Sequence, residues 1–328
     1  MRLSYLALSL MLVGALTPPV LDVVFALQSS PQTTKPAQNP PKEQDDAIRL
    51  TSRLVLVPLS ASDASGKPVR DLTAADFTVE EQGRPQTIAS VGEPGKVPTE
   101  IALLFDVSGS IHGQFRFEQE AAVRFINQVL KPSDAVSVFS IGAKPKLVKS
   151  RTASGEEAIN GLMTLEAVKG ETTAFFDTVV DAALYLGKNA EAGSRRVIIV
   201  ISDGEETNSE RYKLADALRE LQKNDCLFYS INPSGEALRL NAISIRGQSG
   251  METMSAQTGG KAFVPETVRD LEAVFRQIAE ELQAQYLLSY YSTDERADGG
   301  FRTLTIRVPK RPDLRLRARQ GYYAPGAK

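Results

Sequence analysis

A carboxylate and two hydroxyl groups lie close together in the segment DVSGS, residues 106–110. This segment directly follows the apolar run IALLF, residues 101–105, which is typical of a buried strand. Residues two apart in an extended chain point to the same side, so Asp106, Ser108 and Ser110 can direct their oxygens to one point. Such oxygen ligands suit a hard divalent cation, with Mg²⁺ ahead of any thiophilic metal. An ordinary turn is the alternative interpretation of this segment alone.

Two further oxygen donors are expected at the same place. Residues 197–201 form a second apolar run, and Asp203 follows it after one serine. Ligands of open parallel sheets bind at the carboxyl ends of the strands, so Asp203 should lie near Asp106. Thr173 stands just before a helix that is predicted to begin near Phe175. Its hydroxyl could be either an N-cap or a fifth oxygen donor.

Alternating strands and helices are predicted to position these donors. Between about residues 98 and 285, short apolar runs alternate with segments whose apolar residues recur at helical spacing. The strand-like runs are residues 101–105, 135–141, 197–201, 226–231 and 262–264. Runs that are apolar on both faces and separated by helices indicate an α/β fold, with a doubly wound, mostly parallel sheet flanked by helices.

The two flanks of this region have β character. Short strand-like segments occur before it and after it, at residues 54–57, 77–80, 286–290 and 303–308. Neither flank has enough apolar surface for a core of its own. Apolar residues alternate with three arginines over residues 314–319, which predicts a strand with a solvated basic face in preference to an anion-binding ridge.

The first residues have the pattern of an export signal. Arg2 precedes an apolar stretch at residues 3–16, and small residues allow cleavage near Ala26. Asp22 makes a membrane-spanning helix improbable, because the uninterrupted apolar stretch is too short. Residues 27–47 are rich in Pro, Gln, Ser, Thr and Lys and are expected to be a disordered linker. We therefore expect a periplasmic or secreted protein with no stable membrane span in its mature form; an uncleaved anchor is the alternative.

The composition excludes several classes of function. The 328 residues are 42% hydrophobic and carry a net charge of −2, so the balance does not indicate a nucleic-acid partner. One histidine and one cysteine exclude an internal disulfide and most histidine-rich metal sites. The sequence contains no G-x-S-x-G segment and no P-loop, so no class of enzyme is indicated. It also indicates no oligomeric state.

The oxygen donors together resemble the metal-ion-dependent adhesion site of a von Willebrand factor type A (VWA) domain. The resemblance covers about residues 98–285 and rests on three segments that occur in the family's order. They are D-x-S-x-S with Asp106, Ser108 and Ser110, T-A-x-x-D with Thr173, and Ser-Asp-Gly with Asp203. The flanking segments DLTAADFTV, residues 71–79, and GYYAP, residues 321–325, are similar to those of an exported bacterial subfamily that contains this domain. This resemblance implies that the two β flanks pair into one small β module. The resemblance implies that these five residues bind Mg²⁺, or Mn²⁺ or Ca²⁺. It also implies that an Asp or Glu carboxylate of a protein partner completes the coordination of the ion.

These features predict a domain organisation and a function. The expected parts are a signal peptide (1–26), a linker (27–47), an N-terminal β segment (48–96), a VWA domain (97–285) and a C-terminal β segment (286–328). We expect an exported, metal-dependent protein-binding module that is not an enzyme. Two alternatives stay open: a scaffold or assembly factor of the cell envelope whose metal is structural, and a Mg²⁺-dependent hydrolase.

Several polar residues near the predicted site receive simpler interpretations. Asp177 is expected to support the loop that carries the threonine. Glu171, Glu205 and Glu206 are interpreted as solvated loop carboxylates, and His112 as a solvent-facing loop residue.

Overall fold

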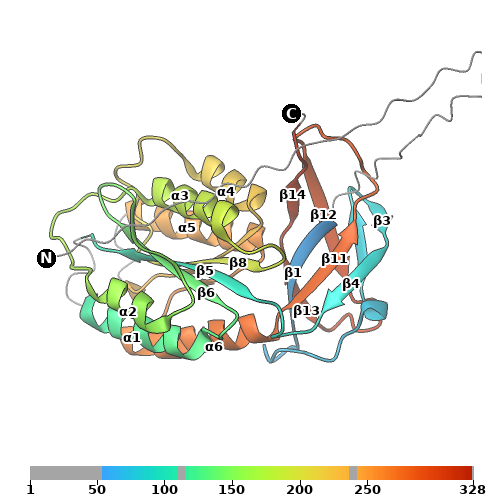
Figure 1. The fold of residues 1–328 in the computed structure, drawn as a ribbon, viewed down its shortest axis with the longest axis horizontal. Coiled ribbons are helices and arrows are strands. Elements are labelled where there is room, and N and C mark those ends of the chain that lie inside the picture. The colour runs from blue at the N-terminus through green and yellow to red at the C-terminus, as the bar shows by residue number, and fades with distance from the viewer. Residues whose placement is uncertain (1–53, 109–114, 236–241, 327–328) are drawn as a thin grey trace, which may run out of the picture. The chain divides into compact units, whose positions relative to one another are not determined.

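A six-stranded sheet forms the centre of the computed structural model, which describes residues 54–108, 115–235 and 242–326 (Figure 1). Its strand order is β10-β9-β8-β5-β6-β7. The strands are β5 (Thr99–Asp106), β6 (Ala135–Ile141), β7 (Lys146–Thr152), β8 (Arg195–Ile201), β9 (Cys226–Ile231) and β10 (Ala262–Phe263). All pairings are parallel except that of β6 with β7. The prediction of a doubly wound, mostly parallel sheet is confirmed.

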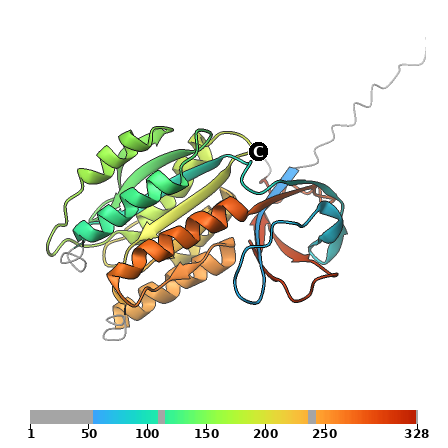
Figure 2. The same ribbon diagram turned by 90° about the horizontal axis from the view of Figure 1, so that it is seen from below.

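Helices cover both faces of this sheet. They are α1 (Phe115–Val129), α2 (Gly155–Met163), α3 (Phe175–Asn189), α4 (Leu214–Lys223), α5 (Ala242–Thr258) and α6 (Leu271–Ala284), with a short 3-10 helix, η4 (Val268–Asp270), before the last. Side chains of α1, α2 and α6 share one core with Leu103 of β5, and those of α3, α4 and α5 share another with Leu104. Figure 2 shows α1 and α6 side by side, where the rings of Phe125 and Phe275 have centroids 4.9 Å apart.

The strand β7 and the helix α5 are among the elements of this part that the sequence does not predict. The edge strand β7 has no fully buried residue, because it lies at the solvent-facing end of the sheet. Its sequence, KLVKSRT, therefore lacks the apolar run of a core strand. Helix α5 buries mostly small and polar residues, among them Ser244, Gly250 and Ser255, so it has no continuous apolar stripe.

The segments on either side of the α/β part pair with each other to form a β module. Its two four-stranded sheets have the orders β13-β1-β11-β4 and β14-β12-β2-β3. The elements are β1 (Leu54–Ser62), η1 (Ala74–Asp76), β2 (Thr78–Glu81), β3 (Arg84–Gln86), β4 (Ile88–Gly92), β11 (Tyr286–Tyr291), β12 (Phe301–Arg307), β13 (Arg315–Ala318) and β14 (Gly321–Tyr323). Strand β1 pairs with β11 and β2 with β12, so both sheets combine the two flanks. One apolar core unites them, and the predicted β module is confirmed.

The arginines after Leu314 do not form a solvated face, so that prediction is wrong for two of the three. Arg315 is exposed, but Arg317 pairs with Glu281 of α6. Arg319 is buried; it pairs with Asp225 and donates a hydrogen bond to the Leu56 carbonyl over 2.6 Å. The arginine side of β13 is covered by the α/β part, and the strand pattern alone does not show which face another element covers.

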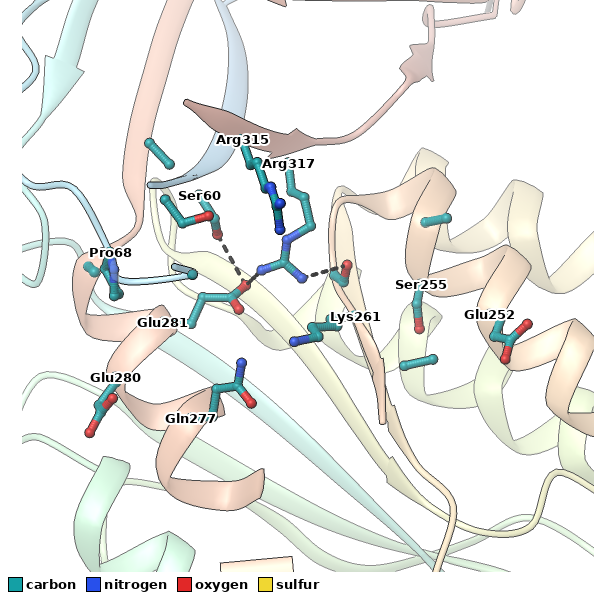
Figure 3. Close-up of a pocket in the computed structure, with 17 residues that line it drawn as sticks. Ser60, Pro68, Glu252, Ser255, Lys261, Gln277, Glu280, Glu281, Arg315 and Arg317 are labelled. Carbon is teal, nitrogen blue, oxygen red and sulfur yellow. Dashed lines mark hydrogen bonds and ion pairs between the residues drawn. The ribbon is translucent and has the colours of Figure 1, made fainter. Parts of the chain in front are cut away.

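Glu281 is the centre of a polar network between the β module and the α/β part. Its Oε1 atom accepts hydrogen bonds from Tyr229 and, over 3.1 Å, from Ser60, and it pairs with Arg317. Figure 3 shows Glu281 between Ser60 and Arg317 in a cavity of about 640 Å³, lined by β1, β13, α5 and α6. The described residues fall in one compact unit that includes both parts.

Replacing Glu281 with glutamine should lower the free energy of unfolding by about 2 kcal/mol, because Arg317 loses its opposite charge in a site that is only partly open to water. Urea denaturation checks this. The control is Glu280→Gln, since Glu280 is the exposed neighbour on the same helix and should change stability by less than about 0.5 kcal/mol. An equal, small effect of both variants would contradict the structural role of Glu281.

No helix among the described residues combines the length and apolar character that crossing a membrane requires. The predicted signal peptide and linker lie outside the described residues.

Candidate metal site

Asp106 is held rigidly at the end of the central strand. It is the last residue of β5 and its side chain is completely buried. Its Oδ1 atom accepts a hydrogen bond from the Ser108 amide over 2.9 Å, and its Oδ2 atom accepts one from the Ser202 hydroxyl. Ser202 directly follows β8, so these bonds join the ends of two neighbouring strands. The carboxylate is therefore oriented by the protein itself.

Asp203 lies at the same edge, one residue beyond Ser202. Its Oδ1 atom accepts a hydrogen bond from the Glu205 amide over 3.0 Å, and its carbonyl accepts one from the Asn232 side chain over 3.1 Å. The next residue, Gly204, has a φ of +74°, and a Cβ atom there would lie 2.8 Å from the Met251 methyl group. The sharp turn after Asp203 thus depends on glycine.

Thr173 reaches this edge from the other neighbour of β5. The Ala174 amide donates a hydrogen bond over 2.8 Å to Gly142, which follows β6, and the last residue of β6 pairs with Asp106. Thr173 is buried, whereas Thr172 is exposed. The amide of Thr173 donates to the Thr207 hydroxyl over 2.8 Å, and its carbonyl accepts from the Thr207 and Asn208 amides over 3.0 Å each.

The threonine is not the N-cap of α3, and that alternative interpretation is wrong. The N-cap is Ala174, which has no side-chain hydrogen bond to the helix. Glu206 serves the helix start instead, because its Oε2 atom accepts a hydrogen bond from the Phe176 amide over 3.0 Å. A carboxylate is favoured there by the unpaired amides and by the helix dipole.

The interpretation of the nearby glutamates as solvated loop groups is also wrong. Glu206 accepts further bonds from Asn208 and Ser209, at distances of 2.9 and 2.6 Å from their amides. Glu171 accepts from the Ala143 amide over 3.1 Å, and Glu205 from the Ser244 hydroxyl over 2.6 Å. All three are half-buried, so they organise the loops around the edge of the sheet.

Asp177 supports the segment that follows Asp203. Its buried carboxylate accepts hydrogen bonds from the amides of Glu210, Arg211 and Tyr212, at 3.3, 3.2 and 3.0 Å. The same segment begins with the residues that bind the backbone of Thr173. Asp177 therefore ties α3 to the threonine loop, as expected, and is not itself at the edge of β5.

Glu118 is a residue of this region that the sequence does not single out. It is a fully buried glutamate of α1, and neither of its carboxylate oxygens has a hydrogen-bond partner among the described residues. One signal for it exists in the sequence: the apolar stripe of α1 includes Ala122 and Phe125, and its continuation by one turn towards the N-terminus reaches Glu118.

The carboxylates of this region repel one another. Burial, followed by the charge of Asp203, raises the pKa of Asp106 to about 6, although the hydrogen bond from Ser202 opposes the rise. Burial and then the charges of Asp106 and Asp203 raise the pKa of Glu118 to about 8. No ion pair of Asp106 or Glu118 occurs within the described residues. A bound cation would remove this repulsion.

The donor set fits a hard cation. Asp106, Ser108, Thr173 and Asp203 are buried residues from three loops at one edge of the sheet, while Ser110 and His112 lie outside the described residues. Within the described part of the chain, no three acidic, histidine or cysteine side chains form a group that could hold a metal ion. Any cation here would need hydroxyl and water oxygens in addition to carboxylates, and Mg²⁺ accepts such a set.

Comparisons with known proteins identify the fold of this part. A family model described as the von Willebrand factor type A domain matches residues 101–206. Similar solved structures include BatB from Bacteroides thetaiotaomicron, a conserved hypothetical protein, with 16% identity, 56% of this chain and 98% of that chain covered, and a TM-score of 0.44. The vWF domain of the pilus tip protein Mfa5 from Porphyromonas gingivalis has 12% identity, coverages of 56% and 94%, and a TM-score of 0.45.

A third similar structure is proximal thread matrix protein 1 from the mussel byssus, with zinc in its MIDAS motif. It has 14% identity, coverages of 60% of this chain and 48% of that chain, and a TM-score of 0.48. A comparison with curated proteins finds no match.

Proposed function

Because the chain contains a von Willebrand factor type A domain, we propose that it is an exported protein-binding module that captures a partner through a divalent cation. Asp106, Ser108, Ser110, Thr173 and Asp203 are the proposed metal-binding residues. The bound ion, Mg²⁺ or else Mn²⁺ or Ca²⁺, would supply an incompletely satisfied positive charge that attracts an Asp or Glu carboxylate of another protein. We propose no catalytic role for these residues.

The observation that carries this proposal is the buried carboxylate of Asp106. The backbone of Ser108 and the hydroxyl of Ser202 orient it, yet no described basic side chain balances its charge. Thr173 and Asp203 reach the same edge from the strands on either side of β5. A buried charge without a counter-charge is costly, so this arrangement favours a bound cation.

Export is proposed from the sequence. The N-terminal pattern ending near Ala26 supports a cleaved signal peptide and a periplasmic or secreted location. The proposed parts of the chain keep the bounds given above, with the VWA domain at residues 97–285 between the two β segments. In such a location the partner would be another envelope or extracellular protein.

Removing the cation should release the partner and leave the domain folded but less stable. Purified protein should capture a partner from envelope extract in Mg²⁺, release it in EDTA, and capture it again when Mg²⁺ is restored. At a Mg²⁺ concentration about 100 times Kd, the ion should stabilise the fold by about 2.7 kcal/mol, measured as a rise in Tm.

Ser108→Ala is the matched variant for this experiment. It should abolish capture while changing the stability of the chelated protein by about 1 kcal/mol, because the backbone bond of residue 108 to Asp106 stays and only the hydroxyl bond to that carboxylate is lost. Capture that persists in EDTA and in Ser108→Ala, together with a Tm that still rises in Mg²⁺, would contradict the adhesion role. That outcome would favour a scaffold whose metal is structural.

A further inference from the structure

Glu118 occupies a position where the fold calls for an apolar side chain. It lies in the first turn of α1, on the face that also carries Phe115 and Ala122, and its side chain is 0% exposed. The Phe115 ring packs edge-on against Phe105, with ring centroids 5.2 Å apart. Phe105 directly precedes Asp106, so the first turn of α1 lies against the end of β5 that carries the proposed site.

The carboxylate of Glu118 has nothing in the described structure that compensates its burial. Both of its oxygens lack a hydrogen-bond partner there. The next residue shows the contrast: Gln119 is also buried, but its side-chain amide donates to the carbonyls of Leu162 and Leu165 over 3.1 and 2.9 Å. The helix dipole favours a negative charge in this turn, but its stabilising free energy is smaller than the free energy needed to desolvate a carboxylate.

The charges nearest to Glu118 make its position more costly still. Asp106 and Asp203 are both buried, and both disfavour its ionised form. A cation bound by Asp106 and Asp203 would relieve this repulsion. The absence of any described group of three acidic residues able to share one ion places Glu118 outside the direct ligands. Its effect on a bound ion must then pass through an intervening group.

We propose that Glu118 is a positioning residue of the cation site, which accepts a hydrogen bond from a cation-bound water and adds a third negative charge. This inference rests on the proposed function, since it requires a cation at Asp106 and Asp203. It predicts that the charge of Glu118 raises the affinity of the site for cations, and raises it more for an ion of higher charge, because the Coulomb energy scales with the charge of the ion.

Calorimetric titration of the mature protein with Mn²⁺ and with Tb³⁺ tests this. Glu118→Gln keeps the shape of the side chain and should weaken Mn²⁺ binding about 10- to 100-fold, the usual loss when a group that orients a ligand is removed. The loss of affinity for Tb³⁺ should be larger: the logarithm of its fold-loss should be about 1.5 times that for Mn²⁺, because the two ions carry three and two charges. Above about pH 8, where burial leaves Glu118 ionised, the chelated variant should also melt at a higher temperature than the chelated wild type, because a buried charge is gone.

Glu120→Gln is the matched control. Glu120 is on the same helix, but it is exposed and pairs with Arg116, so both affinities should stay unchanged. Equal cation affinities of Glu118→Gln and the wild type would overturn the role of Glu118 and leave the proposed function standing. A wild type that binds neither ion would overturn both. If Glu118→Gln does not fold, Glu118→Met, which suits the apolar face, should give the same losses, and unchanged affinities there would again overturn the inference.

Discussion

Replacing Asp106 with asparagine should lower the affinity for Mg²⁺ by about 100-fold or more, which corresponds to about 2.7 kcal/mol. Asp106 is the proposed ligand that the fold orients best, since its two oxygens are held by Ser108 and Ser202. Asparagine has nearly the same shape, so the loss would come from the charge and from one oxygen, and not from a change in packing. Titration calorimetry with Mg²⁺ measures the effect.

The stability of the same variant without metal separates binding from folding. Because Asp106→Asn removes a buried, uncompensated charge, the chelated variant should be at least as stable as the chelated wild type in urea denaturation. Glu166→Gln is the control: this glutamate is exposed, in a loop that is joined to the site by the hydrogen bond from Val168 to Val107. Undiminished Mg²⁺ binding in Asp106→Asn would disprove the proposed site.

The second large effect is expected at Asp177, where alanine should lower the free energy of unfolding by about 3 kcal/mol. The buried carboxylate accepts hydrogen bonds from three successive amides, those of Glu210, Arg211 and Tyr212. A hydrogen bond to a charged group contributes about 1.5–3 kcal/mol, but water can replace part of it in this half-buried loop. Urea denaturation of the chelated protein measures the loss.

Asp181→Ala is the matched control for Asp177. Asp181 lies one turn further along α3, and its one partner among the described residues is the Arg211 guanidinium, over 2.9 Å; 32% of its side chain is exposed. Its removal should cost less than about 1 kcal/mol. Asp177→Ala should also weaken Mg²⁺ binding about 10-fold, because the loop that holds Thr173 loses its anchor. Equal destabilisation by the two variants would show that the amide contacts of Asp177 contribute nothing specific.

Elements whose stability depends on burial of their own side chains were predictable from the sequence. The strand β6 coincides with its predicted range, and β9 does too, because strands covered on both faces must be apolar throughout. The edge strand β7 and helix α5 were missed for the opposite reason: the first is half solvated, and the second packs through small and polar groups. Local periodicity carries no signal for either.

Close to the proposed site, the charged residues were misjudged where their burial depends on partners distant in sequence. Glu206 and Glu171 looked like solvated loop groups because their partners, the amides of Phe176 and Ala143, are distant in sequence. Glu118 was not singled out: the apolar stripe of α1 continues to it, but the lack of a described partner for its carboxylate follows only from the packing of α1 on the sheet. Arg317 and Arg319 were misjudged for the same reason.

The sequence by itself determined the alternation of strands and helices, the β character of the two flanks, and the three segments that make up the proposed metal site. Those features are local, because hydrophobic periodicity and short motifs depend on neighbouring residues. Only the tertiary structure decided which charges are buried, which are paired, and that Glu118 has no partner among the described residues. Burial and charge compensation depend on contacts between segments far apart in the chain, and these exist only once the sheet and its helices have assembled.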